Sequence, residues 1–150
     1  MKIGSPGAAG EAITVASYTT RNTWTDSSGA NRAVGLTVDT ISDFSSPGPL
    51  RNQSQKPDVA APGAMIVSCL SSLSTPRPTD RVSPRFVVNA GTSMACPFMS
   101  GLVALLLQRN SQLDPAGVKA LLKAHSHIPA TALGSFDSKW GFGLIDAGGL

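Results

Sequence analysis

Charged residues are scarce in this sequence, and glutamate is nearly absent. Only 14% of the 150 residues are charged, whereas a typical soluble domain has about 25%. Twelve basic and nine acidic residues give a net charge of +3, and Glu11 is the only glutamate. A charge this small and this scattered gives no basis for a nucleic-acid partner, so we predict none.

Long apolar runs and cysteines are also few. The longest apolar run, residues 102–107, is far shorter than the roughly 20 residues that cross a bilayer, so we predict no membrane association. Residues 1–7 include no apolar segment of signal-peptide length, and the compartment is therefore not readable. Cys69 and Cys96 can form one bridge at most, and we expect two buried thiols instead.

The residues that are present are those of a folded chain of about one domain. Hydrophobic residues make up 41% of the chain, too many for a disordered segment. Short β-branched or alternating segments predict strands at residues 11–20, 38–44, 64–70 (expected to be buried) and 86–90. Residues 21–32 are predicted to form a loop or hairpin, and residues 74–84 a solvated loop.

Two helices are predicted in the second half of the chain. Residues 94–107 are apolar on nearly every side, so this helix must be covered all round. Pro97 fits poorly inside a helix, and we expect it in the first turn or at a kink. The second helix begins with Asp114 as its N-cap and Pro115 in its first position. Strands followed by helices indicate a layered α/β fold.

Residues 89–97 carry the clearest chemical signal. They place Ser93 between the end of a strand and the first turn of the apolar helix. Amides at such a turn point outward and the helix dipole favours negative charge, which suits a nucleophile whose attack creates an oxyanion. A G-x-S-x-G elbow is excluded, because Ala95 stands where its second glycine would be. From the residues alone, a serine that caps the helix is the favoured interpretation.

The same segment resembles a known family. Residues 91–97 (GTSMACP) are similar to the serine signature of the subtilisin-like serine peptidases, the subtilases. Further blocks resemble that family in the family's order, at residues 41–49, 56–63, 100–106 and 140–147. The resemblance covers essentially the whole chain. It implies a subtilisin-like three-layer α/β fold with a mostly parallel sheet, of which only the C-terminal portion is present.

The resemblance also implies the roles of individual residues. Ser93 matches the catalytic nucleophile, which forms an acyl-enzyme with a polypeptide substrate and supplies one oxyanion donor from its backbone amide. Thr92 matches the threonine that supports the oxyanion pocket. Asp58, with carbonyls near Gly7, Ala9 and Ala12, matches a weak cation site of some relatives. One carboxylate is little for calcium, so we assign no metal and no cofactor to these residues.

A serine nucleophile also needs a base and an acid that orients it. In subtilases the order is Asp, His, Ser, yet no histidine precedes Ser93 here. His125 and His127 follow the second helix, where we expect solvated or capping roles. We therefore predict that residues 1–150 are the C-terminal portion of a subtilase catalytic domain. The Asp, the His and the oxyanion Asn are expected in an N-terminal half outside the chain, so these residues alone are expected to be inactive.

Three interpretations follow for this chain. It is a fragment of a serine endopeptidase (by truncation, engineering or processing), a non-catalytic binding remnant of the fold, or one chain of a split protease whose partner supplies the missing half. Without that half we expect an exposed apolar face and a bare strand edge. Subtilases are mostly secreted, which favours an extracellular full-length protein. Nothing in the sequence indicates the substrate preference or the oligomeric state.

Overall fold

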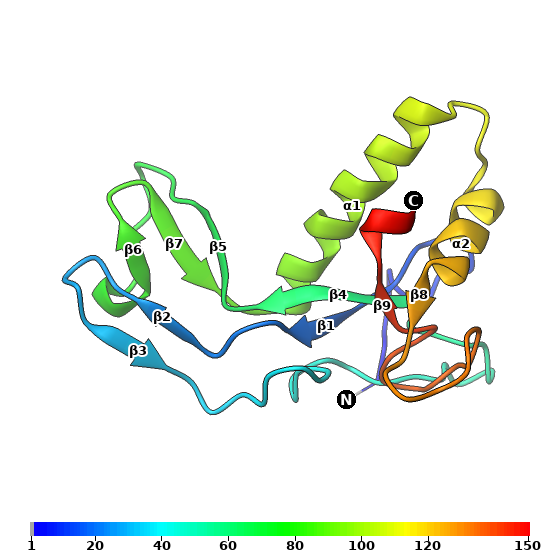
Figure 1. The fold of residues 1–150 in the computed structure, drawn as a ribbon, viewed down its shortest axis with the longest axis horizontal. Coiled ribbons are helices and arrows are strands. Elements are labelled where there is room, and N and C mark those ends of the chain that lie inside the picture. The colour runs from blue at the N-terminus through cyan, green and yellow to red at the C-terminus, as the bar shows by residue number, and fades with distance from the viewer. Residues whose placement is uncertain (1) are drawn as a thin grey trace.

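Four strands form the main sheet, in the order β1-β4-β9-β8 (Figure 1). They are β1 (Val15–Thr19), β4 (Val59–Ala64), β8 (Ser126–His127) and β9 (Leu144–Ile145). β1 and β9 both run parallel to β4, and β8 runs antiparallel to β9. The computed structural model describes residues 2–150, and this mostly parallel sheet confirms the predicted α/β class.

Two helices pack against this sheet, as the sequence predicts. α1 (Thr92–Arg109) begins two residues earlier than expected and contains Pro97 in its second turn rather than its first. α2 (Pro115–Ala124) begins as predicted, because the Asp114 carboxylate accepts a hydrogen bond of 2.7 Å from the Gly117 amide. Within residues 2–150, no helix is both long enough and apolar enough to cross a membrane.

The two faces of the main sheet are covered differently. The helix-facing core is apolar and buried, and consists of Val59, Ala61, Ala95, Met99, Leu106, Val118, Leu122 and Ile145. Successive strand residues point to opposite sides, so Ala60 turns away from the helices and packs against Ile41 and Trp140. Figure 1 shows both helices on one side of β1 and β4, and long loops on the other.

A second group of strands extends away from the main sheet (Figure 1). β5 (Ile66–Cys69), β6 (Arg81–Ser83) and β7 (Phe86–Asn89) form an antiparallel sheet in the order β5-β7-β6. β2 (Thr23–Thr25) and β3 (Asn31–Ala33) form a hairpin, which confirms the hairpin interpretation of residues 21–32. Residues 74–84 are only partly a loop, because they contain a short 3-10 helix at Pro78–Asp80 and strand β6 at Arg81–Ser83. A second short 3-10 helix, Ala147–Gly149, follows β9.

The hairpin turn is organised around one carboxylate. Asp26 is buried and accepts hydrogen bonds from the Ser28 hydroxyl at 2.5 Å, the Arg32 guanidinium at 2.7 Å and the Ser28 and Ala30 amides. The Ser28 hydroxyl and the Arg32 cation hold the pKa of the Asp26 carboxyl well below its usual range. The ionised form of this side chain is therefore part of the folded hairpin.

This geometry predicts an acid-dependent loss of stability. A carboxyl whose pKa is lower in the folded state stabilises the fold above its unfolded pKa, about 3.9 for aspartate, and loses that contribution as the pH falls below it. We expect Asp26→Asn to destabilise the chain at neutral pH, and the difference from the parent protein to shrink as the pH drops from about 5 to about 3. Urea unfolding across this range measures it. A difference that is constant with pH would contradict the assignment.

One strand prediction is wrong and another is only partly confirmed, and in both cases one backbone angle explains why. Residues 38–44 form turns rather than a strand, because Asp39 has a φ of 61°, a left-handed conformation that strands do not contain. Residues 64–70 are divided by Met65, which has a φ of 53°. The buried strand is therefore β4, which ends at Ala64, whereas β5 beyond it is largely exposed.

The expected apolar face is present on α1, but the strand edge is only partly bare. Phe98, Leu105 and Leu107 are 46%, 59% and 37% exposed. On the edge of β1 away from β4, Thr40 and Ser42 form backbone hydrogen bonds with Thr19 and Ser17. Residues 38–44, which were expected to form a strand, thus cover the C-terminal end of the free edge of β1.

The prediction of buried cysteines is also wrong. Cys69 and Cys96 are both free and both exposed. Cys69 lies in β5, whose residues face solvent from Val67 onward. Cys96 lies on α1 where, within residues 2–150, little packs against the helix.

Candidate active site

Ser93 lies at the second position of α1, and its side chain is exposed. The start of the helix is tied to the main sheet, because the Gly91 amide donates a 2.8 Å hydrogen bond to the carbonyl of Gly63 in β4. The Met94 amide in turn donates to the Gly91 carbonyl at 2.9 Å. Ser93 is therefore presented to solvent from a first turn that the parallel sheet holds in place.

Gly63 is required where β4 approaches this turn. A Cβ at this position would lie 2.4 Å from the Ser17 hydroxyl and 3.0 Å from the Gly91 carbonyl oxygen. Behind it, the buried hydroxyl of Ser42 lies 3.0 Å from that of Ser17 and 2.8 Å from that of Thr19. Fully paired buried hydroxyls make a rigid support, so the backbone around Ser93 has little freedom to shift.

The electrostatics of the turn favour negative charge beside Ser93. The first amides of a helix have no partner within it and carry the positive end of the helix dipole. Gly91 is the N-cap, and no side chain caps these amides. The interpretation of Ser93 as the capping residue is therefore wrong. The turn resembles a site that stabilises an oxyanion formed next to the serine hydroxyl.

Neither histidine of the chain can serve Ser93 as a base. His125 follows α2 and lies with Leu106 and Arg109 around a cavity at the far end of α1. The helix between Ser93 and Leu106 is about 20 Å long, at about 1.5 Å per residue. His127 belongs to β8, beyond β9 and β4 in the main sheet. Within residues 2–150, no histidine therefore lies within hydrogen-bonding reach of the Ser93 hydroxyl.

Three carboxylates that are candidates to orient a base, those of Asp39, Asp80 and Asp137, have structural partners instead. The Asp39 carboxylate accepts a 3.0 Å hydrogen bond from the Tyr18 hydroxyl. Burial, and then this contact with Asp39, raise the pKa of Tyr18. Asp80 pairs with Arg77 at 2.8 Å, and Asp137 accepts hydrogen bonds from the Lys139 and Trp140 amides.

At the residues expected to resemble a cation site, a lysine ammonium occupies the position beside the carboxylate where a cation would bind. The Lys56 ammonium donates to the Asp58 carboxylate and to the Ala12 carbonyl, each at 2.6 Å. The same carboxylate accepts a 2.7 Å hydrogen bond from the Thr14 amide. A second lysine, Lys119, lies 3.9 Å from Asp58, and burial lowers its pKa. Within residues 2–150 no three His, Cys, Asp or Glu side chains gather at a point, and these residues do not fit calcium.

This arrangement predicts that stability does not depend on metal. The Lys56 ammonium is built into the fold, so neither an excess of chelator nor added calcium is expected to change the melting temperature of the 150-residue chain. Thermal unfolding followed by circular dichroism, with and without chelator, tests this. A melting temperature that falls on chelation would show that a cation is bound.

The comparisons with known proteins agree with the predicted family and with the fold. The model of the "Subtilase family" matches residues 1–143, and the chain therefore belongs to the subtilase family of serine peptidases. It is 37% identical over 124 residues to the serine protease AprX of Bacillus subtilis, covering 81% of this chain and 26% of that protein. It is 40% identical over 87 residues to the subtilisin-like protease SBT1.4 of Arabidopsis thaliana, covering 55% of this chain and 11% of that one.

Two solved structures share the fold. The CspB protease of Clostridium perfringens superposes with a TM-score of 0.63 at 26% identity, over 97% of this chain and 27% of that one. Sphericase gives the same TM-score at 24% identity, over 96% of this chain and 43% of that one, which is a likeness of fold alone. The chain thus spans between 11% and 43% of the length of these four proteins. These likenesses confirm the expected subtilisin-like architecture.

Proposed function

We propose that this chain is the nucleophile-bearing, C-terminal portion of a serine endopeptidase catalytic domain. The observation that carries the proposal is the exposed Ser93 in the uncapped first turn of α1, held by the Gly63 carbonyl of the main sheet. Family membership supports serine peptidase chemistry in general and a polypeptide as substrate. Thr92, beside Ser93 in the same turn, is proposed to support the oxyanion pocket.

The proposed reaction is acyl transfer at a peptide bond. The Ser93 hydroxyl oxygen attacks the scissile carbonyl carbon, and a histidine outside residues 2–150 takes its proton. The amide of Ser93 donates to the oxyanion that forms. The peptide C–N bond then breaks, the leaving amine receives the proton, and water hydrolyses the acyl-enzyme.

The isolated chain is proposed to be inactive. Its exposed apolar surface supports the proposal that a further portion of the catalytic domain packs against it. When members of a catalytic triad are removed, the remaining rate enhancement over the reaction in water is at most about 10³–10⁴, and much of it comes from the oxyanion hole. A groove lined by Ile13, Val15, Met99 and Val103 lies along one side of α1, and the exposed Phe98 and Leu105 lie on the other side of the helix. This groove lies between α1 and the start of β1, where a further parallel strand and its helix would add to the sheet. We propose that the portion bearing the His and the Asp docks there.

A fluorophosphonate probe tests the proposal through the intact mass of the chain. The 150 residues alone are expected to remain unlabelled. Addition of a polypeptide with the N-terminal half of a subtilase catalytic domain, such as that of the Bacillus relative, is expected to give stoichiometric labelling that Ser93→Ala abolishes. Labelling of the chain alone would contradict its proposed inactivity. Labelling that persists in Ser93→Ala would contradict the nucleophile. A docked half without labelling would favour the binding remnant.

A further inference from the structure

We propose that the arm formed by the β2–β3 hairpin and the β5–β7–β6 sheet binds an acidic segment of the polypeptide substrate, several residues away from the scissile bond. The arm comprises residues 20–34 and 66–89, and it extends away from the main sheet in Figure 1. The proposal rests on the proposed function, because it takes Ser93 as the point of cleavage.

The positive charge of the chain is concentrated on this arm. Five of the twelve basic residues lie on it, all of them arginines, but only two of the nine acidic residues do. The rest of the chain contains seven residues of each sign, so the arm accounts for the whole net charge of +3. These residues are scattered along the sequence, and the fold brings them together. The charged residues of the arm are Arg21, Asp26, Arg32, Arg77, Asp80, Arg81 and Arg85.

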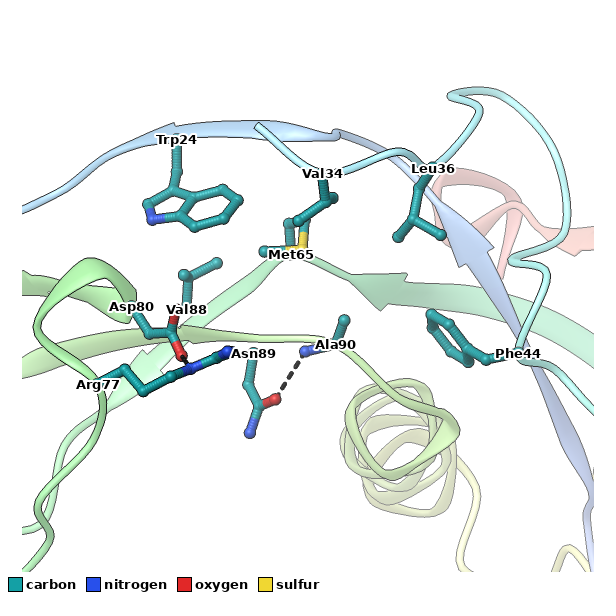
Figure 2. A pocket seen from close by; sticks show the side chains of 10 residues that line it. All are labelled: Trp24, Val34, Leu36, Phe44, Met65, Arg77, Asp80, Val88, Asn89 and Ala90. Atoms are coloured by element: carbon teal, nitrogen blue, oxygen red, sulfur yellow. Dashed lines mark hydrogen bonds and ion pairs between the residues drawn. The ribbon is translucent and has the colours of Figure 1, made fainter. Parts of the chain in front are cut away.

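The hairpin and the sheet of the arm form one framework. The Ser27 amide in the hairpin turn donates a 2.7 Å hydrogen bond to the Arg81 carbonyl of β6, and the Trp24 indole N–H donates to the Thr79 carbonyl at 2.8 Å. Between the hairpin and β7 lies a cavity of about 270 Å³ whose wall on the hairpin side is apolar and consists of Trp24, Val34 and Leu36 (Figure 2). The arginines are therefore held on a structure that is ordered before any ligand binds, which favours binding.

Two arginines of the arm are paired with its two aspartates. The Arg32 guanidinium lies 2.7 Å from the Asp26 carboxylate, and the Arg77 guanidinium lies 2.8 Å from that of Asp80 (Figure 2 shows the second pair). The charges of each pair cancel. The net charge of the arm is therefore that of its three other arginines.

These three arginines are free to bind a partner. Within residues 2–150, Arg21, Arg81 and Arg85 form no ion pair. Arg21 and Arg85 are exposed and Arg81 is half-buried. A guanidinium group presents a planar fork of N–H donors that matches the two oxygens of a carboxylate. Charge and geometry together favour a partner with several carboxylates.

Two of the free arginines flank the strand that leads to the nucleophile. Arg81 pairs with Val87 in the register of β6 and β7, and Arg85 immediately precedes β7. Val87 and Ser93 are six residues apart in the chain, so their Cα atoms are separated by at most about 20 Å. An extended substrate cleaved at Ser93 therefore reaches this surface with a side chain about six residues or fewer from the scissile bond. Because the proposed substrate is a polypeptide, an acidic polypeptide segment is favoured over a nucleic acid.

Peptide binding to the 150-residue chain tests this surface without requiring catalysis. The probe is a fluorescein-labelled peptide of four glutamates separated by glycines, and its reference is the same peptide with glutamines. At low ionic strength we expect the glutamate peptide to bind saturably and about tenfold or more tighter than the glutamine peptide. Its affinity is expected to fall when the salt concentration is raised to about 0.15 M, because salt screens exposed charges. Fluorescence anisotropy measures both affinities, and equal affinities would overturn the proposal.

Two double variants that remove the same charge locate the binding. Arg81→Gln with Arg85→Gln removes two free guanidinium groups from the arm and is expected to weaken binding of the glutamate peptide about tenfold. Arg51→Gln with Lys139→Gln removes two charges from exposed positions outside the arm and is expected to change the affinity by less than about twofold. Equal losses in the two variants would show a dependence on net charge alone and would overturn the proposal.

Two further measurements identify the partner. In the protease formed with the N-terminal half, a substrate with glutamates about six residues from the scissile bond is expected to have a severalfold lower KM than its glutamine version at similar kcat. Equal KM values would contradict an acidic substrate segment. A single-stranded oligonucleotide of equal charge that binds more tightly than the glutamate peptide would make the arm a nucleic-acid surface and overturn the proposal. Peptide binding does not depend on the reactivity of Ser93, so a failure of the proposed function, seen as absent fluorophosphonate labelling, is distinguishable from a failure of this inference.

Discussion

Replacing Ser93 by alanine is expected to lower turnover by on the order of 10⁶ in the protease formed when this chain is joined to its histidine and aspartate. The hydroxyl oxygen is the atom that forms the acyl-enzyme, so no neighbouring group can replace it. Ser93 is exposed and its side chain forms no hydrogen bond recorded among the described residues, so its removal leaves no buried group unpaired. Folding is therefore expected to be unchanged, and kcat on a peptide substrate measures the loss.

Ser100 provides the matched control for that substitution. It lies on the same helix, is exposed, and donates its hydroxyl to the Cys96 carbonyl at 3.1 Å. Ser100→Ala removes a hydroxyl from α1 without touching its first turn, so kcat is expected to stay within about twofold of the parent enzyme. Full activity in Ser93→Ala would place the nucleophile elsewhere. Equal losses of kcat in Ser93→Ala and Ser100→Ala would show that the effect comes from a disturbance of α1 and not from removal of the Ser93 hydroxyl.

Lys56→Met is expected to destabilise the chain by about 3–5 kcal/mol, the usual cost of leaving one member of a buried ion pair without its partner. The Lys56 side chain is only 5% exposed, and its ammonium is shared between Asp58 and the Ala12 carbonyl. Without it, the Asp58 carboxylate keeps the Thr14 amide and the more distant Lys119. Against a total stability of about 5–15 kcal/mol, the loss is large. Urea unfolding of the 150-residue chain measures it.

Two further variants separate burial from charge. Arg77→Met breaks an ion pair in which the Arg77 side chain is 83% exposed, so it is expected to cost about 1 kcal/mol or less. Adding Asp58→Asn to Lys56→Met is expected to recover much of the loss, because the amide still accepts from the Thr14 N–H and leaves no unpaired charge. A loss below about 1 kcal/mol in Lys56→Met would show that the pair is effectively solvated.

Some elements of the fold can be predicted from residues that are close in sequence, whereas others depend on contacts between distant residues. The Asp114 cap and the helix after Ser93 follow from neighbouring residues, and the structure contains both. The contact between Lys56 and Ala12 joins residues 44 positions apart, and no nearby residue signals it. The φ of Asp39 likewise has no signature in the alternating pattern of residues 38–44, which is why that segment was predicted as a strand.

The candidate site divides in the same way. The position of Ser93 at a helix start was predictable, because a strand, a glycine and an apolar helix follow one another in the chain. The cavity beside it was not, since Trp24, Val34 and Leu36 lie in or just beyond residues 21–32, a polar stretch that predicts a loop or hairpin but no packing partner. Apolar residues within such a stretch were the available signal. They become a wall only because the hairpin folds onto β6 and β7.

The open face of α1 has a kinetic consequence. The apolar side chains Phe98 and Leu105 are exposed, and the proposed active enzyme forms only when a further polypeptide packs against this helix. If that polypeptide continues from the same chain, it is present at an effective concentration near millimolar, and activity per molecule is independent of dilution. If it is a separate chain, activity per molecule falls on dilution once the concentration drops below the dissociation constant. A dilution series of the active enzyme therefore distinguishes a protease made of one continuous chain from a two-chain protease.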